Sequence, residues 1–137
     1  NLNVFFETFV NNSREPIIAQ QFLPDVSNGD KRIILVDGEP IGAINRIPPH
    51  DDIRSNMHVG GTPTKSDLTE RDIEICKRLS PVLKKKNLFF VGIDVIGQHL
   101  TEINVTSPTG LQELERFENK NYASMIWEGI EKKWNNG

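Results

Sequence analysis

The chain has one cysteine, no excess of basic charge and no long apolar run, and each shortage excludes a class of protein. Cys76 is the only cysteine among 137 residues, which excludes a disulfide-bonded scaffold and favours a reducing, cytoplasmic location. Lysine and arginine number 16 against 19 acidic residues, which argues against a general nucleic-acid surface because such surfaces are basic. No apolar run approaches the ~20 residues needed to span a membrane.

What remains is the composition of a globular segment of single-domain size. Hydrophobic residues make up 36% of the chain and charged residues 26%, enough to bury a core. Four segments have helical patterns, at residues 2–9, 69–85, 111–117 and 122–134. Thr69 is the expected cap of the second helix, Pro81 is expected to bend or break its end, and Cys76 lies on its apolar stripe as a core thiol.

Three oxygen-bearing side chains interrupt two otherwise apolar strand patterns at residues 89–96 and 100–105. Strand residues alternate between faces, so Asp94 faces away from the apolar residues of the first strand, as do Glu102 and Asn104 in the second. A three-residue loop at 97–99 places Asp94 across from Glu102, whereas a two-residue loop moves Asp94 to the opposite face. We therefore expect the three-residue loop and one shared polar surface.

Two carboxylates and an amide oxygen on rigid strands suit a hard divalent cation such as Mg²⁺, which usually keeps substrate phosphates in its shell. The pattern therefore predicts phosphate-linked chemistry around Asp94, Glu102 and Asn104. A second interpretation stays open on spacing alone, in which Asp94 and Glu102 are ordinary solvent-face residues of an amphipathic hairpin.

An Asp-Gly dipeptide at residues 37–38 predicts a second hairpin, because both central residues of a type I′ turn need positive φ. A two-residue turn pairs Arg32 with Ala43 and Asp30 with Asn45. The polar ends of both strands then meet at one rim, where a ligand can be held. The alternative for Arg32 is a solvated charge on the strand edge.

Three further segments bear on the prediction of a binding site. Residues 16–22 read as a short buried strand, and residues 48–67 form a loop long enough to be functional or disordered. In that loop Gly60 and Gly61 let backbone N–H groups approach phosphate oxygens, and Arg54 adds a charge-matched fork. After the strand pattern at residues 100–105, residues 107–109 lead into the start of a helix. They either bind a substrate carboxylate there or only cap the helix.

The motifs resemble a known family when they are taken in order. The runs V-G-I-D-V-I-G at 91–97 and E-I-N-V-T-S-P-T at 102–109, together with the upstream motifs at 30–32, 36–40, 46–48, 54–56 and 60–61, are similar to the carboxy-terminal signature of bacterial glutathione synthetases, which are ATP-grasp ligases. The Asn-Val-Thr-Ser-Pro segment distinguishes the chain from D-alanine–D-alanine ligases and ribosomal-protein glutamate ligases.

The resemblance implies an α+β fold for residues 1–137: the C-terminal portion of an ATP-grasp domain, with an antiparallel sheet of two hairpins and the 16–22 strand, and helices packed on one face. It also implies that the amino-terminal substrate domain and the first ATP-grasp lobe precede this chain, together with the lysines and glycine-rich flap that cover the phosphates. We expect the chain to be a carboxy-terminal fragment with little turnover of its own.

The implied activity of the intact enzyme is the ATP-dependent joining of γ-glutamylcysteine and glycine through an acyl phosphate, with release of ADP and phosphate. We expect a cytoplasmic homo-oligomer that binds neither nucleic acid nor a membrane. The alternatives are another ATP-grasp carboxylate–amine ligase and a non-catalytic nucleotide-binding module. The implied residues are Asp94, Glu102 and Asn104 for Mg²⁺ or Mn²⁺; Arg32, Arg46, Arg54 and Asn56 for catalysis; Gln20, Gln21, Phe22, Leu23, Asp30, Gly60 and Gly61 for ATP; and Ser107, Pro108 and Thr109 for the substrate.

Overall fold

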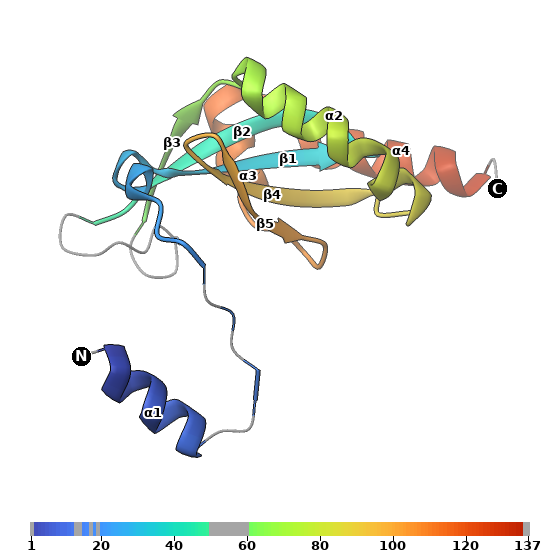
Figure 1. The fold of residues 1–137 in the computed structure, drawn as a ribbon. Helices are drawn as coiled ribbons and strands as arrows, with labels where there is room; N and C mark the ends of the chain where they lie inside the picture. Colours follow the sequence, from blue (N-terminus) through green and yellow to red (C-terminus); the bar gives the residue numbers. More distant parts are fainter. Residues whose placement is uncertain (1, 13–14, 17, 19, 50–60, 136–137) are drawn as a thin grey trace.

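The computed structural model describes residues 2–12, 15, 16, 18, 20–49 and 61–135, which form one five-stranded sheet with helices around it (Figure 1). In chain order the elements are α1 (Leu2–Asn12), the 3-10 helix η1 (Pro24–Asn28), β1 (Asp30–Val36), β2 (Glu39–Ile47), β3 (Thr62–Ser66), α2 (Glu70–Lys85), β4 (Phe90–Ile96), β5 (His99–Asn104), α3 (Leu111–Glu118) and α4 (Tyr122–Asn135). The strand order is β3-β2-β1-β4-β5, and each neighbouring pair is antiparallel. The expected α+β class with an antiparallel sheet is confirmed.

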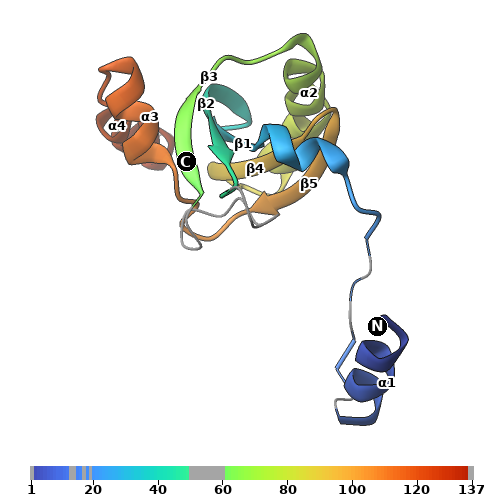
Figure 2. The same cartoon turned by 90° about the vertical axis from the view of Figure 1, so that its left-hand side faces the viewer.

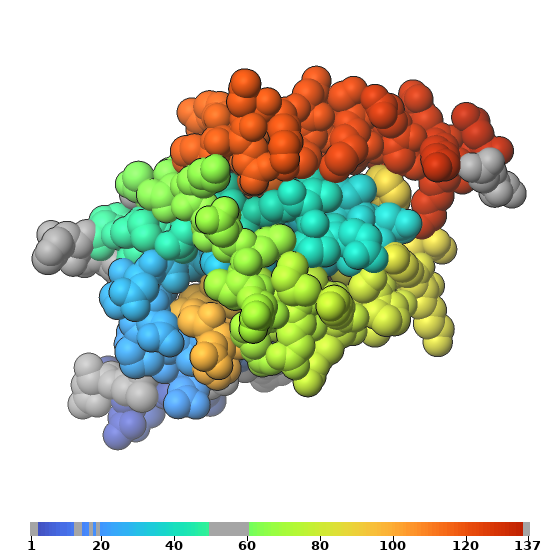
Figure 3. All heavy atoms as spheres, turned by 90° about the horizontal axis from the view of Figure 1, so that it is seen from above, coloured from blue at the N-terminus to red at the C-terminus, as the bar shows by residue number. Residues whose placement is uncertain are grey.

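Helices cover both faces of the sheet, whereas the sequence analysis placed them on one. Figure 2 shows α2 on one side of the strands and α3 with α4 on the other, and from above the cyan strands β1 and β2 lie between these two layers (Figure 3). The cause is that β1 is apolar on both faces. Ile33 packs in a core with Ile75 of α2, while Ile34 packs in a second core with Leu114 of α3.

The β1–β2 hairpin has the expected two-residue turn but a different register. Asp37 and Gly38 both take positive φ, at 47° and 78°, as a type I′ turn requires. The pairing then shifts by one residue between Ile34 and Leu35, as a β-bulge does. Arg32 therefore pairs with Ile44 and Asp30 with Arg46, so the predicted partners Ala43 and Asn45 are wrong by one position. The bulge places Arg46 on the same face as Arg32.

The β4–β5 hairpin reaches the predicted pairing by a different route. Ile96 pairs with His99, so the loop holds two residues and not three. Gly97 opens it with a φ of 58°, which matches the glycine requirement at the first position of a type II′ turn. A register shift between Asp94 and Val95 leaves one extra residue on β5, and Asp94 still lies opposite Glu102.

The edge strand β3, which pairs with β2, lies in a segment that the sequence analysis assigned to a loop. Residues 62–66 form β3 and pair with β2, whereas the described residues of the expected 16–22 strand, 16, 18 and 20–22, have no strand structure. Figures 1 and 2 both show α1 lying apart from the sheet.

The later helices lie where the sequence predicted them. Thr69 caps α2 in a reciprocal capping box with Asp72, and the helix continues through Pro81 to Lys85 instead of breaking. Cys76 is 1% exposed in the core beneath α2. Trp127 and Trp134 of α4 are 65% and 84% exposed. Within the described residues, no helix has the length and apolar character needed to cross a membrane.

Candidate functional site

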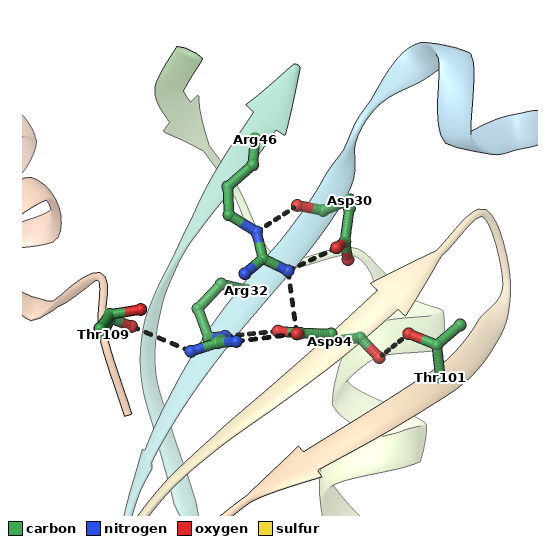
Figure 4. Close-up of polar contacts among 6 residues, drawn as sticks. All are labelled: Asp30, Arg32, Arg46, Asp94, Thr101 and Thr109. Atoms are coloured by element: carbon green, nitrogen blue, oxygen red, sulfur yellow. Dashed lines mark hydrogen bonds and ion pairs between the residues drawn. The ribbon is translucent and has the colours of Figure 1, made fainter. Parts of the chain in front are cut away.

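Strands β1, β2 and β4 bring four charged side chains together on the sheet face that carries α3 and α4 (Figure 4). Arg32 donates to both carboxylate oxygens of Asp94, through Nε to Oδ1 and through Nη2 to Oδ2 at 2.8 Å. Arg46 Nη2 lies 2.9 Å from Asp94 Oδ2 and 2.5 Å from Asp30 Oδ2. Asp94 is therefore held between two guanidinium groups.

The cluster is buried yet charged. Arg32, Arg46 and Asp94 are 5%, 4% and 2% exposed. Burial by itself raises the pKa of Asp94, but the hydrogen bond from Arg32 and the charges of Arg46 and Arg32 outweigh it, so the pKa lies below its ordinary value. Burial lowers the pKa of Arg32, and the hydrogen bond and charge of Asp94, with Glu102 and Asp30, raise it overall. Arg32 and Asp94 are therefore both ionised at neutral pH.

The two other predicted metal ligands complete a set of oxygens around Arg32. Glu102 pairs with Asp94 and Asn104 with Gly92 across the β4–β5 ladder. With its amide assigned so that both atoms find partners, Asn104 donates to Glu102 Oε1 at 3.0 Å and accepts from Arg32 Nη2 at 3.2 Å. Glu102 is exposed and Asn104 half-buried, so the set opens to solvent on the β5 side.

Two glycines allow Arg32 to lie across this surface. A Cβ on Gly92 would stand 2.8 Å from Pro108 Cβ and 3.1 Å from Arg32 Cδ, and a Cβ on Gly110 would stand 3.3 Å from Arg32 Cγ. Arg32 Nη1 also donates to the carbonyl of Thr109 at 3.2 Å. The segment that was predicted to bind substrate is thereby joined to the charged cluster.

Thr101 is a residue of this site that the sequence analysis missed. It is the extra residue between the pairs Val95–Leu100 and Asp94–Glu102, and its hydroxyl donates to the backbone carbonyl of Asp94 at 3.1 Å. Without this bulge, a hairpin with a two-residue turn would place Glu102 on the face of the sheet opposite Asp94. The signal for it was present, because Gly97 predicts a two-residue turn and the polar face then requires one extra residue.

The remaining predicted residues fall into three groups. Arg54, Asn56 and Gly60 lie outside the described residues, and Gly61 is buried directly before β3. Among the residues implied for ATP, Gln20, Gln21 and Phe22 are exposed and have no strand structure, and Leu23 precedes η1 with an extended backbone. Ser107 takes a φ of 47°, Pro108 is buried and Thr109 is exposed.

The chemistry of the oxygen donors fits a hard divalent cation. Among the described residues, no three histidine, cysteine, aspartate or glutamate side chains gather as a metal site; the predicted set differs in taking its third oxygen from the amide of Asn104. Asp94 and Asn104 both already contact one positive group, the Arg32 guanidinium, and Asn104 contacts Glu102. Two carboxylates and an amide are ligands that Mg²⁺ and Mn²⁺ accept.

Comparison with known proteins identifies the family of the chain. Residues 1–119 match the family model described as prokaryotic glutathione synthetase, ATP-grasp domain. The chain belongs to this ATP-grasp family. It is 56% identical over 133 residues to the glutathione synthetase of Agrobacterium fabrum, 57% identical over 131 residues to that of Brucella melitensis, and 48% identical over 134 residues to that of Synechocystis.

These matches cover most of the chain but less than half of each relative. They span 97%, 96% and 98% of this chain and 42% of the length of each of the three glutathione synthetases. The family assignment therefore rests on nearly all of the sequence in hand, and the activity of a whole protein is a separate question.

Proposed function

We propose that this chain forms the metal- and phosphate-binding part of an ATP-dependent ligase that joins γ-glutamylcysteine to glycine. The observation that supports it is the buried pairing of Arg32 and Arg46 with Asp94, next to Glu102 and Asn104, in a chain of the prokaryotic glutathione synthetase ATP-grasp family. Mg²⁺ or Mn²⁺ is the proposed cofactor and ATP the co-substrate.

In this proposal the reaction has two displacements. The substrate carboxylate attacks the γ-phosphorus of ATP and ADP leaves; the glycine amine then attacks the acyl carbon and phosphate leaves. Both steps develop negative charge on phosphoryl or carbonyl oxygens, which fixed positive donors in a site of low dielectric stabilise. We assign this role to Arg32 and Arg46, whose guanidinium groups meet at Asp94 from neighbouring strands.

The divalent cation, when bound by Asp94, Glu102 and Asn104, supplies positive charge for the nucleotide phosphates. The chain's own cysteine takes no part in this chemistry. Burial, followed by the charge of Asp72, raises the pKa of the Cys76 thiol to about 11, so the thiol stays protonated at neutral pH and is a poor nucleophile.

The test is a Glu102→Gln variant of the full-length protein, assayed for ADP release with γ-glutamylcysteine and glycine. Glu102 is exposed, so the substitution leaves the core intact. We expect ADP release to fall by more than the roughly 100-fold that loss of an outer-shell partner costs a metal site. Glu131→Gln, the same change at an exposed position of α4, is the matched control. Wild-type turnover by the Glu102 variant would refute the metal assignment.

The acceptor is tested in the same assay by exchanging the substrates. ADP release that requires γ-glutamylcysteine with glycine supports the proposed reaction, whereas release with D-alanine or glutamate would assign the chain to a different carboxylate–amine ligase. A cytoplasmic location and assembly as a homo-oligomer are further parts of the proposal, which subcellular fractionation and sedimentation would test.

A further inference from the structure

The Arg32 guanidinium lies where the oxygen donors of the candidate metal site converge. Asp94 accepts from its Nε and Nη2, and the Asn104 amide oxygen lies 3.2 Å from the same Nη2. Two of the three proposed ligands of a divalent cation are therefore already directed at a positive group of the chain itself.

Asp94 is close to saturated by these contacts. Its Oδ1 accepts from Arg32, and its Oδ2 accepts from Arg32 at 2.8 Å and lies 2.9 Å from Arg46. A carboxylate offers about four lone-pair sites, so three of them face guanidinium groups. A cation that uses Asp94 must compete with one or both arginines.

The balance of charge points in the same direction. Among the described residues, Arg32 and Arg46 face Asp30, Asp94 and Glu102, and these five side chains together carry one net negative charge. A divalent cation added to this set would give it one net positive charge. The buried arginines would then lack full compensation by carboxylates, which costs free energy. An anion that takes hydrogen bonds from the guanidinium groups removes that cost.

We propose that Asp94 exchanges partners: a phosphate-type anion draws Arg32 and Arg46 onto itself and so frees the Asp94 oxygens for the divalent cation. The inference rests on the proposed function, since it concerns the same ligands. Its consequence is that anion and cation bind cooperatively, each raising the affinity for the other by the same factor. The arginines are then counter-ions of Asp94 before they are donors to phosphate.

The experiment measures Mn²⁺ binding to the full-length protein by electron paramagnetic resonance, at one ionic strength, in potassium chloride and in potassium sulfate. Sulfate stands in for the phosphoryl group and binds Mn²⁺ weakly in solution. We expect the Kd for Mn²⁺ to be lower in sulfate by about 5- to 150-fold, the usual range of coupling between sites. Arg46→Gln should bind Mn²⁺ more tightly in chloride and lose most of the sulfate effect.

Arg78→Gln is the matched control, because Arg78 is 76% exposed and pairs with Glu74 on the surface of α2; it should behave as wild type. A second measurement needs no variant: Mn²⁺ and sulfate together should raise the wild-type Tm by more than the sum of their separate effects. Equal Mn²⁺ affinity in the two salts would overturn the exchange while leaving the metal assignment standing. Absence of Mn²⁺ binding in both salts would overturn the two together.

Discussion

Lys31 and Arg32 are neighbours on β1, and each meets a buried carboxylate on its own face of the sheet. Lys31 Nζ lies 2.6 Å from Asp72 Oδ2 on the α2 face, where Asp72 is 1% exposed. Arg32 meets Asp94 on the other face. Each pair joins one positive side chain to one buried carboxylate. The two pairs differ in the further groups that surround them.

The Lys31–Asp72 pair is complete within the fold. Asp72 accepts from the backbone N–H of Thr69 at 2.8 Å, its own N–H donates to the Thr69 hydroxyl, and Lys31 also donates to the carbonyl of Asp67. These contacts start α2 and fasten it to β1. The Arg32 side has a second arginine and further carboxylates that open toward solvent. A buried ion pair thus indicates a site only when charged partners remain beyond the pair itself.

The largest expected effect is that of Asp94→Asn. It leaves Arg32 and Arg46 buried beside a neutral amide, and removing one partner of a buried ion pair costs roughly 3 to 5 kcal/mol. We expect both the free energy of unfolding and Mn²⁺ binding to fall, measured by urea denaturation followed by circular dichroism and by titration. A variant as stable as wild type would mean that the arginines are already solvated.

Asp72→Asn should separate the two faces. It weakens the contact with Lys31 and the capping box, and hydrogen bonds to charged groups contribute about 1.5 to 3 kcal/mol. We expect the free energy of unfolding to fall by about that amount, while the Mn²⁺ affinity of the folded protein stays unchanged. A large loss of Mn²⁺ affinity in this variant would show that the two faces are coupled.

Acidification should weaken both pairs. Burial raises the pKa of Asp72, but hydrogen bonds from Lys31 and Thr69 lower it overall, and the pKa of Asp94 is lowered as well. Carboxylates with lowered pKa contribute stability that is fully present above their unfolded pKa and is lost as the pH falls through the folded one. Urea unfolding should therefore show a free energy that declines below about pH 4. The decline should be shallower in Asp72→Asn, and an equal slope would exclude Asp72 as a contributor.

Thr101→Val should have the smallest effect, because it removes one hydroxyl from the bulge that aligns Glu102 with Asp94. A net hydrogen bond contributes about 0.5 to 1.5 kcal/mol, so Mn²⁺ binding should weaken by no more than about tenfold. Thr101→Ser, which keeps the hydroxyl, should bind Mn²⁺ as wild type does. Equal affinities in the valine and serine variants would show that the bulge holds its shape without the hydroxyl.

The sequence predicted which residues meet at this site better than it predicted how they meet. Alternation correctly assigned Asp94, Glu102 and Asn104 to one face, because side chains of a strand follow a period of two. The bulges at the two hairpins break that period locally. They depend on tertiary fit, so the partner of Arg32 was wrong by one residue and the loop at Gly97 by one residue.

Two features of the fold depend on partners distant in sequence. The pairing of β3 with β2 was missed because a five-residue edge strand, TPTKS, carries little apolar signal. Coverage of both sheet faces was missed because Ile33 and Ile34 read as one apolar run, and only α2 and α3 together reveal two faces. The ion pair of Lys31 with Asp72 likewise joins residues that lie 41 positions apart in the chain.

The two tryptophans of the chain both lie on α4, exposed and away from the charged cluster. Indole emission therefore reports the solvent around α4 in the native state and has little further red shift to gain when the chain unfolds. Titrations with a ligand would therefore show little change in intrinsic fluorescence even when the ligand occupies the site. An optical signal from the site needs a probe on the face of β5 that carries Glu102 and Asn104.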